Sequence, residues 1–267
     1  MIRDLTVGQY YPADSVVHKL DPRVKLFGTM IFLIAVFSFR GGAGFALITV
    51  FLAGIIKLSK LPFRYMIKGL KAIIVLMAIT AFFNLFLTNG TNVIWQWKWI
   101  RITQEGIETA VKMLFRLIYL ILGTSIMTLT TTPNELTDGL EKSLRPLQVI
   151  HVPIHEIAMI MAIALRFIPI LVEETDKIMK AQMARGADFE NGNLIKRAKA
   201  LIPLLVPLFI SAFRRANDLA MAMEARCYRG GVGRTKMKPL RYSVCDYAGD
   251  FVLIIFLGIV IILRRFG

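Results

Sequence analysis

Uninterrupted apolar runs constrain this chain more than any other feature. Residues 26–39 and 43–56 are two runs of equal length without a charged side chain, and residues 72–88 form a third, longer run. A helix of about 14 residues rises about 21 Å, so to meet a hydrocarbon layer about 30 Å thick the short runs must borrow flanking residues, thin the bilayer or form a re-entrant hairpin. We favour two short helices. Hydrophobic residues make up 56% of the 267 residues, which is more than one soluble core can bury. The sequence therefore predicts an all-α integral membrane protein.

The charge balance fits the same class. The chain has 33 Lys and Arg against 18 Asp and Glu, a net charge of +15. Such a surplus can mark a nucleic-acid-binding protein, but cytoplasmic loops of membrane proteins also retain basic residues, and we predict no nucleic-acid partner. Residues 57–71 carry no acidic residue, which places them and the N-terminus in the cytoplasm. Their basic residues are Lys57, Lys60, Arg64, Lys68 and Lys71.

These features predict about five spans and three regions. The last region, residues 247–267, contains one span and ends outside the cell, and the middle region, residues 130–246, stays in the cytoplasm and in contact with the bilayer. The first region, residues 1–129, contains four spans, at about residues 26–39, 43–56, 72–88 and 107–129.

Two polar features accompany the spans. All three tryptophans, Trp95, Trp97 and Trp99, follow the third span, where they fit either an outer headgroup belt or a small soluble hairpin. The fourth span carries charges at i, i+4 spacing, which lie on one helix face. We interpret this stripe as support for a neighbouring helix and not as an ion path. Its members are Glu108, Lys112 and Arg116.

The middle region contains two further apolar stretches, residues 157–172 and 198–213, each continued by charged residues. Pro203 and Pro207 in the second stretch remove backbone donors that lipid cannot replace, and they could bend the helix. The pattern predicts two long helices at the cytoplasmic face, apolar toward membrane partners and charged toward water. A seven-span topology, with residues 173–197 outside, is the alternative.

The two long helices end in the same pattern, Ala-x-x-Ala-Arg, which occurs at residues 181–185 and again at 222–226. An arginine at a helix C-terminus is favoured by the helix dipole, so each one alone could be a cap. Because the pattern repeats, we interpret the two ends as tips that dock into acidic grooves on a pair of partner subunits, where guanidinium binds carboxylate. Gly186 can close the first helix, and Gly230, Gly231 and Gly233 follow the second. The tips are Ala184, Arg185 and Gly186, and Ala225, Arg226 and Cys227.

These motifs resemble the transmembrane T component (EcfT) of energy-coupling factor transporters, which are ABC-type importers of vitamins and transition metals. The resemblance covers essentially the whole chain. Residues 8–12, Ser15, His18 and the run Leu20-Asp21-Pro22-Arg23 read like the family's opening signature, and the tips match its short arginine motifs. Cys227 departs from the family's frequent Ala-Arg-Gly.

The resemblance implies a scaffold that transmits energy and is not an enzyme. Family members hold two ABC ATPase subunits on their arginine tips and a membrane-embedded, substrate-binding S component on their apolar helices. ATP and Mg²⁺ would then belong to the partner ATPases, and this chain would carry no cofactor. In agreement, residues 230–236 are rich in glycine but lack the order that cradles phosphates.

Other functions have weaker support in the sequence. His151 and His155 have i, i+4 spacing, but Pro153 between them spoils a common helix face, and we predict no metal site. An intramembrane enzyme would need paired ionisable groups, whereas Glu108 and Asp250 are expected near opposite membrane faces. A permease subunit with its own substrate path would need more polar residues in its spans. Cys227 and Cys245 are expected to be free thiols.

Overall fold

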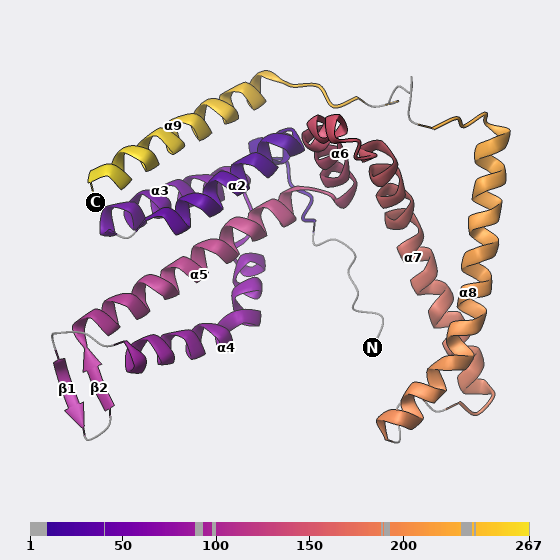
Figure 1. Ribbon diagram of the computed structural model, residues 1–267, viewed down its shortest axis with the longest axis horizontal. Helices are drawn as coiled ribbons and strands as arrows, with labels where there is room; N and C mark the ends of the chain where they lie inside the picture. Colours follow the sequence, from indigo (N-terminus) through magenta and orange to yellow (C-terminus); the bar gives the residue numbers. More distant parts are fainter. Residues whose placement is uncertain are drawn as a thin grey trace. The chain divides into compact units, whose positions relative to one another are not determined.

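The computed structural model describes residues 10–39, 41–88, 93–97, 100–187, 189, 193–230, 237 and 239–266, for some of them the backbone alone. Figure 1 shows the order of the elements along the chain. The chain divides into two compact units. Among the described residues, those up to Gly139 and from Leu240 onward form the membrane unit, and those from Leu140 to Pro239 form the α7–α8 unit.

The helices of the membrane unit follow the apolar runs. The first two runs extend into their flanks, as one of the alternatives predicted: one helix begins at Pro22, before the first run, and the next ends at Ser59, after the second. With 17 and 18 residues they rise about 26 and 27 Å. A further helix, α6, continues from this unit into the other. The bounds are α1 (Val16–Lys19), α2 (Pro22–Ser38), α3 (Gly42–Ser59), α4 (Phe63–Leu87), α5 (Gln104–Thr130), α6 (Pro133–Leu144) and α9 (Val244–Phe266).

The region around α4 differs from the expectation in two ways. Helix α4 begins at Phe63, well before the predicted span at residue 72, and bends by 58° between Phe63–Lys71 and Ile73–Phe86, so part of the basic segment is helical. After α4, strands β1 (Val93–Trp97) and β2 (Ile100–Thr103) form an antiparallel hairpin. The backbone of the tryptophan segment is thus a hairpin, as one of the two alternatives predicted, and Trp99 lies outside the described residues. Its place relative to the headgroup belt stays a prediction.

The core of the membrane unit lies where α2, α3, α5 and α9 meet. Ile48 of α3 and Val36 of α2 are almost completely buried, and the rings of Phe51 and Phe256 stack with centroids 4.0 Å apart. Helix α5 approaches α2 closely at Gly123, where a Cβ atom would lie 2.4 Å from the Phe32 ring. Only glycine therefore fits this crossing without a rearrangement.

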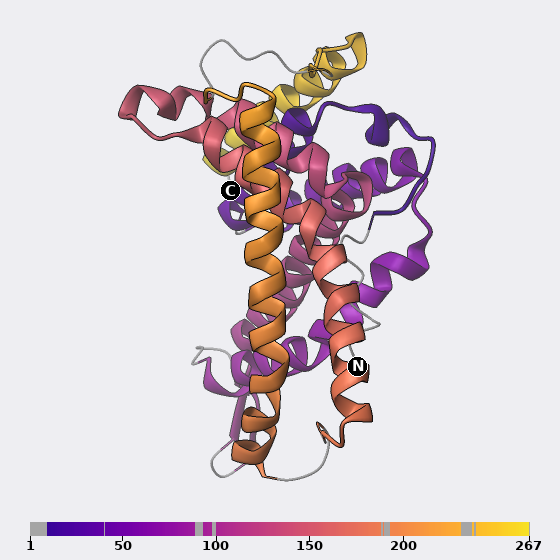
Figure 2. The same ribbon diagram turned by 90° about the vertical axis from the view of Figure 1, so that its right-hand side faces the viewer.

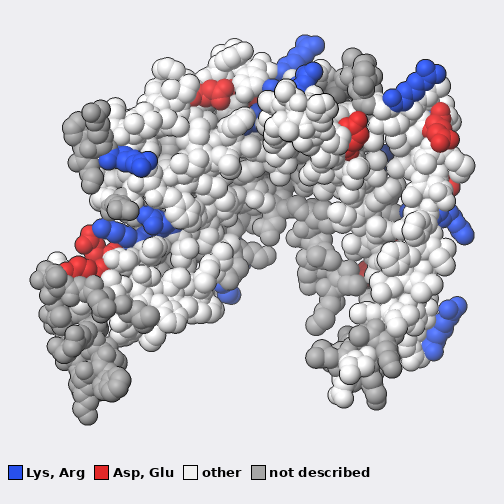
Figure 3. All heavy atoms as spheres, in the orientation of Figure 1, with Lys and Arg blue, Asp and Glu red and all other residues white. Residues whose placement is uncertain are grey.

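Large apolar side chains also cover outer faces of the helices, which a soluble protein would bury. On α4 they include Ile74, Val75, Leu76, Ile79, Phe82 and Phe83. On the face shown in Figure 3, charged side chains are sparse among the described residues. Among those residues, α3, α5, α7, α8 and α9 are each long and apolar enough to cross a membrane, and the bent α4 would make a sixth. The fold is that of an all-α membrane protein, with one small hairpin.

The α7–α8 unit contains the 3-10 helix η2 (Arg145–Ile150) and the long helices α7 (Ile154–Ala184) and α8 (Leu194–Ala225). The two long helices were predicted, and each apolar stretch continues into its charged extension as one helix (Figure 1). Helix α8 runs through Pro203 and Pro207. By length and composition α7 and α8 qualify as spans, so their predicted place at the cytoplasmic face stays a prediction.

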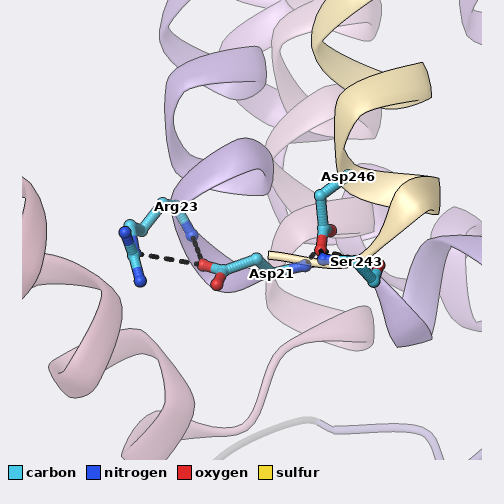
Figure 4. Close-up of polar contacts among 4 residues, drawn as sticks. All are labelled: Asp21, Arg23, Ser243 and Asp246. Atoms are coloured by element: carbon cyan, nitrogen blue, oxygen red, sulfur yellow. Dashed lines mark hydrogen bonds and ion pairs between the residues drawn. The ribbon is translucent and has the colours of Figure 1, made fainter. Parts of the chain in front are cut away.

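A buried carboxylate joins the starts of α2 and α9 (Figure 4). Asp246, which is 1% exposed, accepts hydrogen bonds from the backbone N–H of Asp21 (2.6 Å) and of Ser243 (2.7 Å), and from the Ser243 hydroxyl (2.8 Å). Asp21 in turn is the N-cap of α2, and its Oδ1 accepts the backbone N–H of Arg23 (2.9 Å). A single side chain therefore satisfies donors at two helix N-termini that are far apart in the sequence.

Basic side chains close other helix ends in the same unit. The Lys25 ammonium donates to the carbonyls of His18 (3.0 Å) and Thr130 (2.9 Å), at the ends of α1 and α5. Arg116 of α5 donates to the carbonyl of Phe39, which follows α2 (3.0 Å). Of the charged stripe on α5, Arg116 thus supports a neighbouring helix as predicted, whereas Lys112 pairs with Glu108 within α5. Lys25 and Arg116 meet carbonyls that have no partner within their helices, where the helix dipole also favours positive charge.

We predict that Asp246→Asn destabilises the membrane unit. An amide has one acceptor oxygen and one N–H₂ group, so the donors on one side of Asp246 would face another donor. A buried polar group without a partner costs about 1–3 kcal/mol. The thermal midpoint of unfolding in mild detergent should fall, whereas Asp250→Asn, one turn further along α9 and partly exposed, should leave it nearly unchanged. Equal midpoints for the two variants would contradict the assigned role.

Candidate coupling site

The predicted arginine tips lie at the ends of a pair of long helices that pack against each other in opposite directions (Figures 1 and 2). Glu174 of α7 accepts a hydrogen bond from the Ser211 hydroxyl of α8 and forms an ion pair with Arg215 (2.9 Å). Further along α7, Gln182 approaches the carbonyl of Pro203, which precedes Ser211 on α8. From the first of these contacts to the second, the residue number on α7 rises by as much as the residue number on α8 falls. The two helices are therefore antiparallel and keep one register along the contact.

The prolines of α8 explain one of these contacts. In an α-helix the carbonyl of residue 203 would accept the N–H of residue 207, but Pro207 has no N–H to donate. The Pro203 carbonyl therefore lacks its usual partner, and the Gln182 amide lies 3.5 Å from it. The proline pair thus exposes a main-chain acceptor toward α7 within an uninterrupted helix.

The first tip closes α7 through its main chain. The N–H of Gly186 donates to the Met183 carbonyl (3.0 Å), and the N–H of Ala187 donates to the Gln182 carbonyl (3.0 Å). Gly186 has a positive φ of 88°. These two bonds and the left-handed residue define a Schellman motif, with Arg185 at the C-cap.

The second tip repeats the same geometry at the end of α8. The N–H of Cys227 donates to the Glu224 carbonyl (2.8 Å), and the N–H of Tyr228 donates to the Met223 carbonyl (3.0 Å), with Arg226 at the C-cap. Cys227 adopts the left-handed conformation, with φ of 56°. The expectation that the following glycines end this helix is therefore wrong in detail. Gly230 does have a positive φ, but it lies beyond the cap, and Gly231 and Gly233 lie outside the described residues.

All six tip residues are exposed. Because main-chain N–H groups make both caps, neither arginine side chain is needed to close its helix. The side chains of Arg185 and Arg226 form no ion pair among the described residues. The antiparallel packing does not bring the two arginines together: it places them at opposite ends of the pair. The site can therefore present one guanidinium to each of two separate acidic surfaces.

The other predicted site residues, Asp21, Pro22 and Arg23, lie in the membrane unit and not at the tips. Asp21 and Pro22 start α2 as N-cap and first helical residue, an arrangement that proline favours. The Arg23 guanidinium forms an ion pair with Asp21 (3.4 Å) and lies 5.2 Å from the Tyr242 ring centroid. Burial raises the pKa of Tyr242, which keeps this ring neutral. The signature residues thus organise helix starts.

Two interactions in the structure are not predicted from the sequence: the one that Asp246 makes with Asp21, and the ion pair between Glu174 and Arg215. Asp246 could have been found, because a serine followed at the i+3 position by an acid is a helix-start pattern before an apolar run. Its second partner, Asp21, is 225 residues away and leaves no local signal. Glu174 and Arg215 belong to the charged continuations of the two apolar stretches, and nothing local in the sequence pairs them. Their separation in the sequence equals that of the two tips, and this shared interval was the signal that could have linked them.

The histidines make structural contacts. His155, in the first turn of α7, bonds Glu141 (3.1 Å), while His151 caps η2 with φ of 61°. His18 bonds the Ser15 hydroxyl (2.6 Å) and the Tyr11 carbonyl (3.0 Å). In the described part of the chain, no three His, Cys, Asp or Glu residues gather as a metal would require. Cys227 and Cys245 are free thiols, as expected.

We predict opposite effects from exchanging the third residue of the two tips. Cys227→Gly should strengthen the end of α8, because a residue with a Cβ pays about 1 kcal/mol in the left-handed region. Gly186→Cys should weaken the end of α7 by a similar amount, since a Cβ there would meet no other atom and only the conformation changes. Amide hydrogen exchange at the cap residues measures both effects. Changes of the same sign in the two variants would exclude backbone strain as their cause.

The sequence matches known proteins over nearly its whole length. The family model of CbiQ, described as a cobalt transport protein, matches residues 13–238. A relative from Clostridium kluyveri is 54% identical over 265 residues, covering 99% of this chain and 98% of its own. One from Ruminiclostridium cellulolyticum is 52% identical over 264 residues (99% and 98%), and one from Bacillus subtilis is 45% identical over 264 residues (99% and 100%).

All three relatives are named energy-coupling factor transporter transmembrane protein EcfT. The matches run through the N-terminal signature, the membrane helices and both arginine tips, as the resemblance in the sequence implied. The chain belongs to the EcfT family of energy-coupling factor transporter transmembrane proteins.

Proposed function

We propose that this chain is the scaffold that couples two ABC ATPase subunits to a membrane-embedded, substrate-binding S component. ATP, with its Mg²⁺, would be bound and hydrolysed on the ATPases. The motion would pass through α7 and α8 and drive uptake of a vitamin or metal ion held by the S component. This chain itself would take no part in catalysis.

One observation carries the proposal: two exposed arginines occupy identical backbone positions at opposite ends of one helix pair. Identical caps suit two identical or similar binding grooves, and opposite ends suit two separate subunits. Guanidinium binds carboxylate through two parallel hydrogen bonds, which fixes orientation as well as position. A rigid helix pair held at both ends can then move when its partners move.

The apolar surface of α8 supports the S-component contact. Its exposed large side chains follow helical spacing along the middle of the helix and would be costly to leave in water. They are Leu201, Ile202, Leu205, Val206, Phe209, Ile210 and Phe213. A partner that is itself embedded in the membrane would match such a face.

The alternative of a permease with its own path is less well supported. An apolar cavity of about 320 Å³ in the membrane unit is lined by α1, α2, α3, α5 and α9. Its few polar residues already bond within the protein: Lys25 to the His18 and Thr130 carbonyls, Thr29 to the Lys25 carbonyl, and Thr130 to the Ile126 carbonyl. A hydrophilic substrate would meet few polar groups in this cavity, which favours a scaffold over a permease.

The test of coupling is the double variant Arg185→Glu and Arg226→Glu. Reversing both charges replaces two attractions to acidic grooves with repulsions, so the ATPases should no longer co-purify in mild detergent and ATP-driven uptake should be lost. Insertion into the membrane should be unaffected, because both side chains are exposed outside the membrane unit's core.

The matched control reverses two exposed basic residues elsewhere on the same helices, Lys180→Glu and Arg214→Glu. It changes the net charge equally and should retain most uptake. Full uptake in the tip variant would refute the proposed docking role, and equal losses in both variants would show that charge alone matters.

We further propose that the N-terminus and the α7–α8 unit lie in the cytoplasm and the C-terminus outside. In a chain with Cys227 and Cys245 replaced by serine, a cysteine introduced at Asn191 should resist an impermeant thiol reagent added to whole cells. It should react once the cells are opened. Ready labelling of intact cells would instead support seven spans, with residues 173–197 outside.

A further inference from the structure

The contact between α7 and α8 includes a polar cluster at matching positions of the two helices. Glu174 follows the apolar stretch of α7 almost directly, and Arg215 follows that of α8 in the same way. Glu174 accepts hydrogen bonds from Ser211 and from Arg215, whose Nη2 lies 2.9 Å from Oε2. The Glu174 and Arg215 side chains are 22% and 39% exposed, so the pair is partly shielded from water and stronger than a free surface ion pair.

The two charged residues of this cluster lie equally far along the chain from the tips of their own helices. Glu174 precedes Arg185 by as many residues as Arg215 precedes Arg226. At a rise of about 1.5 Å per residue, each tip is about 16 Å from the cluster along its own helix. Since the helices are antiparallel, the tips extend from the cluster in opposite directions, as Figure 1 shows for the ends of α7 and α8. The separation in sequence between Glu174 and Arg215 therefore equals the separation between Arg185 and Arg226.

Apolar helix faces alone do not fix such a register. They pack in several ridge-and-groove arrangements that differ little in energy, and one helix can slide or rotate on the other. A carboxylate that bonds one hydroxyl and one guanidinium fixes both the axial position and the rotation, because hydrogen bonds depend on direction. The cluster thus specifies one register among those that the apolar faces allow.

We propose that Glu174, Ser211 and Arg215 form a register lock that fixes the distance between the two arginine tips and transmits displacement from one tip to the other. The proposal rests on the proposed coupling function. Glu174 and Arg215 are then positioning residues: they act through Arg185 and Arg226 and touch no substrate. Without the lock, each arginine tip can move independently of the other. The ATPases then stay bound, but a movement of one ATPase no longer moves α7 and α8 together.

The geometric test measures the distance between the tips. Spin labels are placed on Cys227 and on a cysteine replacing Ala187, with Cys245→Ser, in the full chain in mild detergent. We expect a narrow distance distribution, which broadens or shifts in Glu174→Arg and in Arg215→Glu and narrows again in the charge-swapped double variant. The neighbouring exposed residues serve as controls: Glu173→Arg and Arg214→Glu should leave the distribution unchanged.

The functional test uses the same variants in the complex with its partners. Each single variant should retain the co-purifying ATPases yet reduce ATP-driven uptake about tenfold, which corresponds to the loss of one charge-assisted hydrogen bond. The swapped variant should recover uptake. Rescue would show that the pairing of opposite charges matters and not the identity of either residue, and retained ATPase binding with reduced uptake separates this role from a general loss of structure.

The outcomes separate the two proposals. An unchanged tip distance in Glu174→Arg, a change that the swap does not reverse, or full uptake in the single variants each overturns the register lock. If no ATPase co-purifies with the unmodified chain, the coupling function fails, while the distance measurement still decides whether the lock exists.

Discussion

The main chain at helix ends is the constraint on which this structure depends. A helix in lipid satisfies its own backbone except at its first four N–H and last four C=O groups, and lipid offers those groups no partner. In the membrane unit, buried or half-buried charges lie at these ends. Asp246 binds the starts of α2 and α9, Lys25 binds the ends of α1 and α5, and Arg116 binds the carbonyl that follows α2. These charged side chains thus form hydrogen bonds with main-chain groups at helix ends.

The α7–α8 unit solves the same problem differently, and the difference leaves its arginines available. Its two long helices end in Schellman motifs, so main-chain N–H groups bind the last carbonyls. Arg185 and Arg226 consequently remain exposed, each directly beyond the last residue of its helix. One carbonyl that a proline leaves without its helical partner is that of Pro203, and a side chain of the other helix approaches it. The main-chain caps leave both arginine side chains exposed, and the antiparallel pairing places them at opposite ends of the helix pair.

Much of the fold followed from local patterns. Apolar runs predicted the helices of the membrane unit and the final helix, and apolar stretches with charged continuations predicted α7 and α8. The errors have a shared cause. The early start of α4 and the closure of α8 at Cys227 depend on backbone conformations that residue type alone does not dictate. A cysteine in the left-handed region is an exception to the preference for glycine, and only the hydrogen bonds around it reveal that it closes the helix.

By itself, the sequence determined the class of protein, the helices and the repeat that marks the two arginine tips, because hydrophobic periodicity and composition act over a few turns of chain. Tertiary structure alone decided which ends meet. It brought Asp246 to Asp21 across 225 residues, and it paired α7 with α8 in the antiparallel register that places Glu174 on Arg215. Such pairings depend on contacts between distant segments, whose energies no single segment encodes. The positions of the tips relative to each other follow from that register.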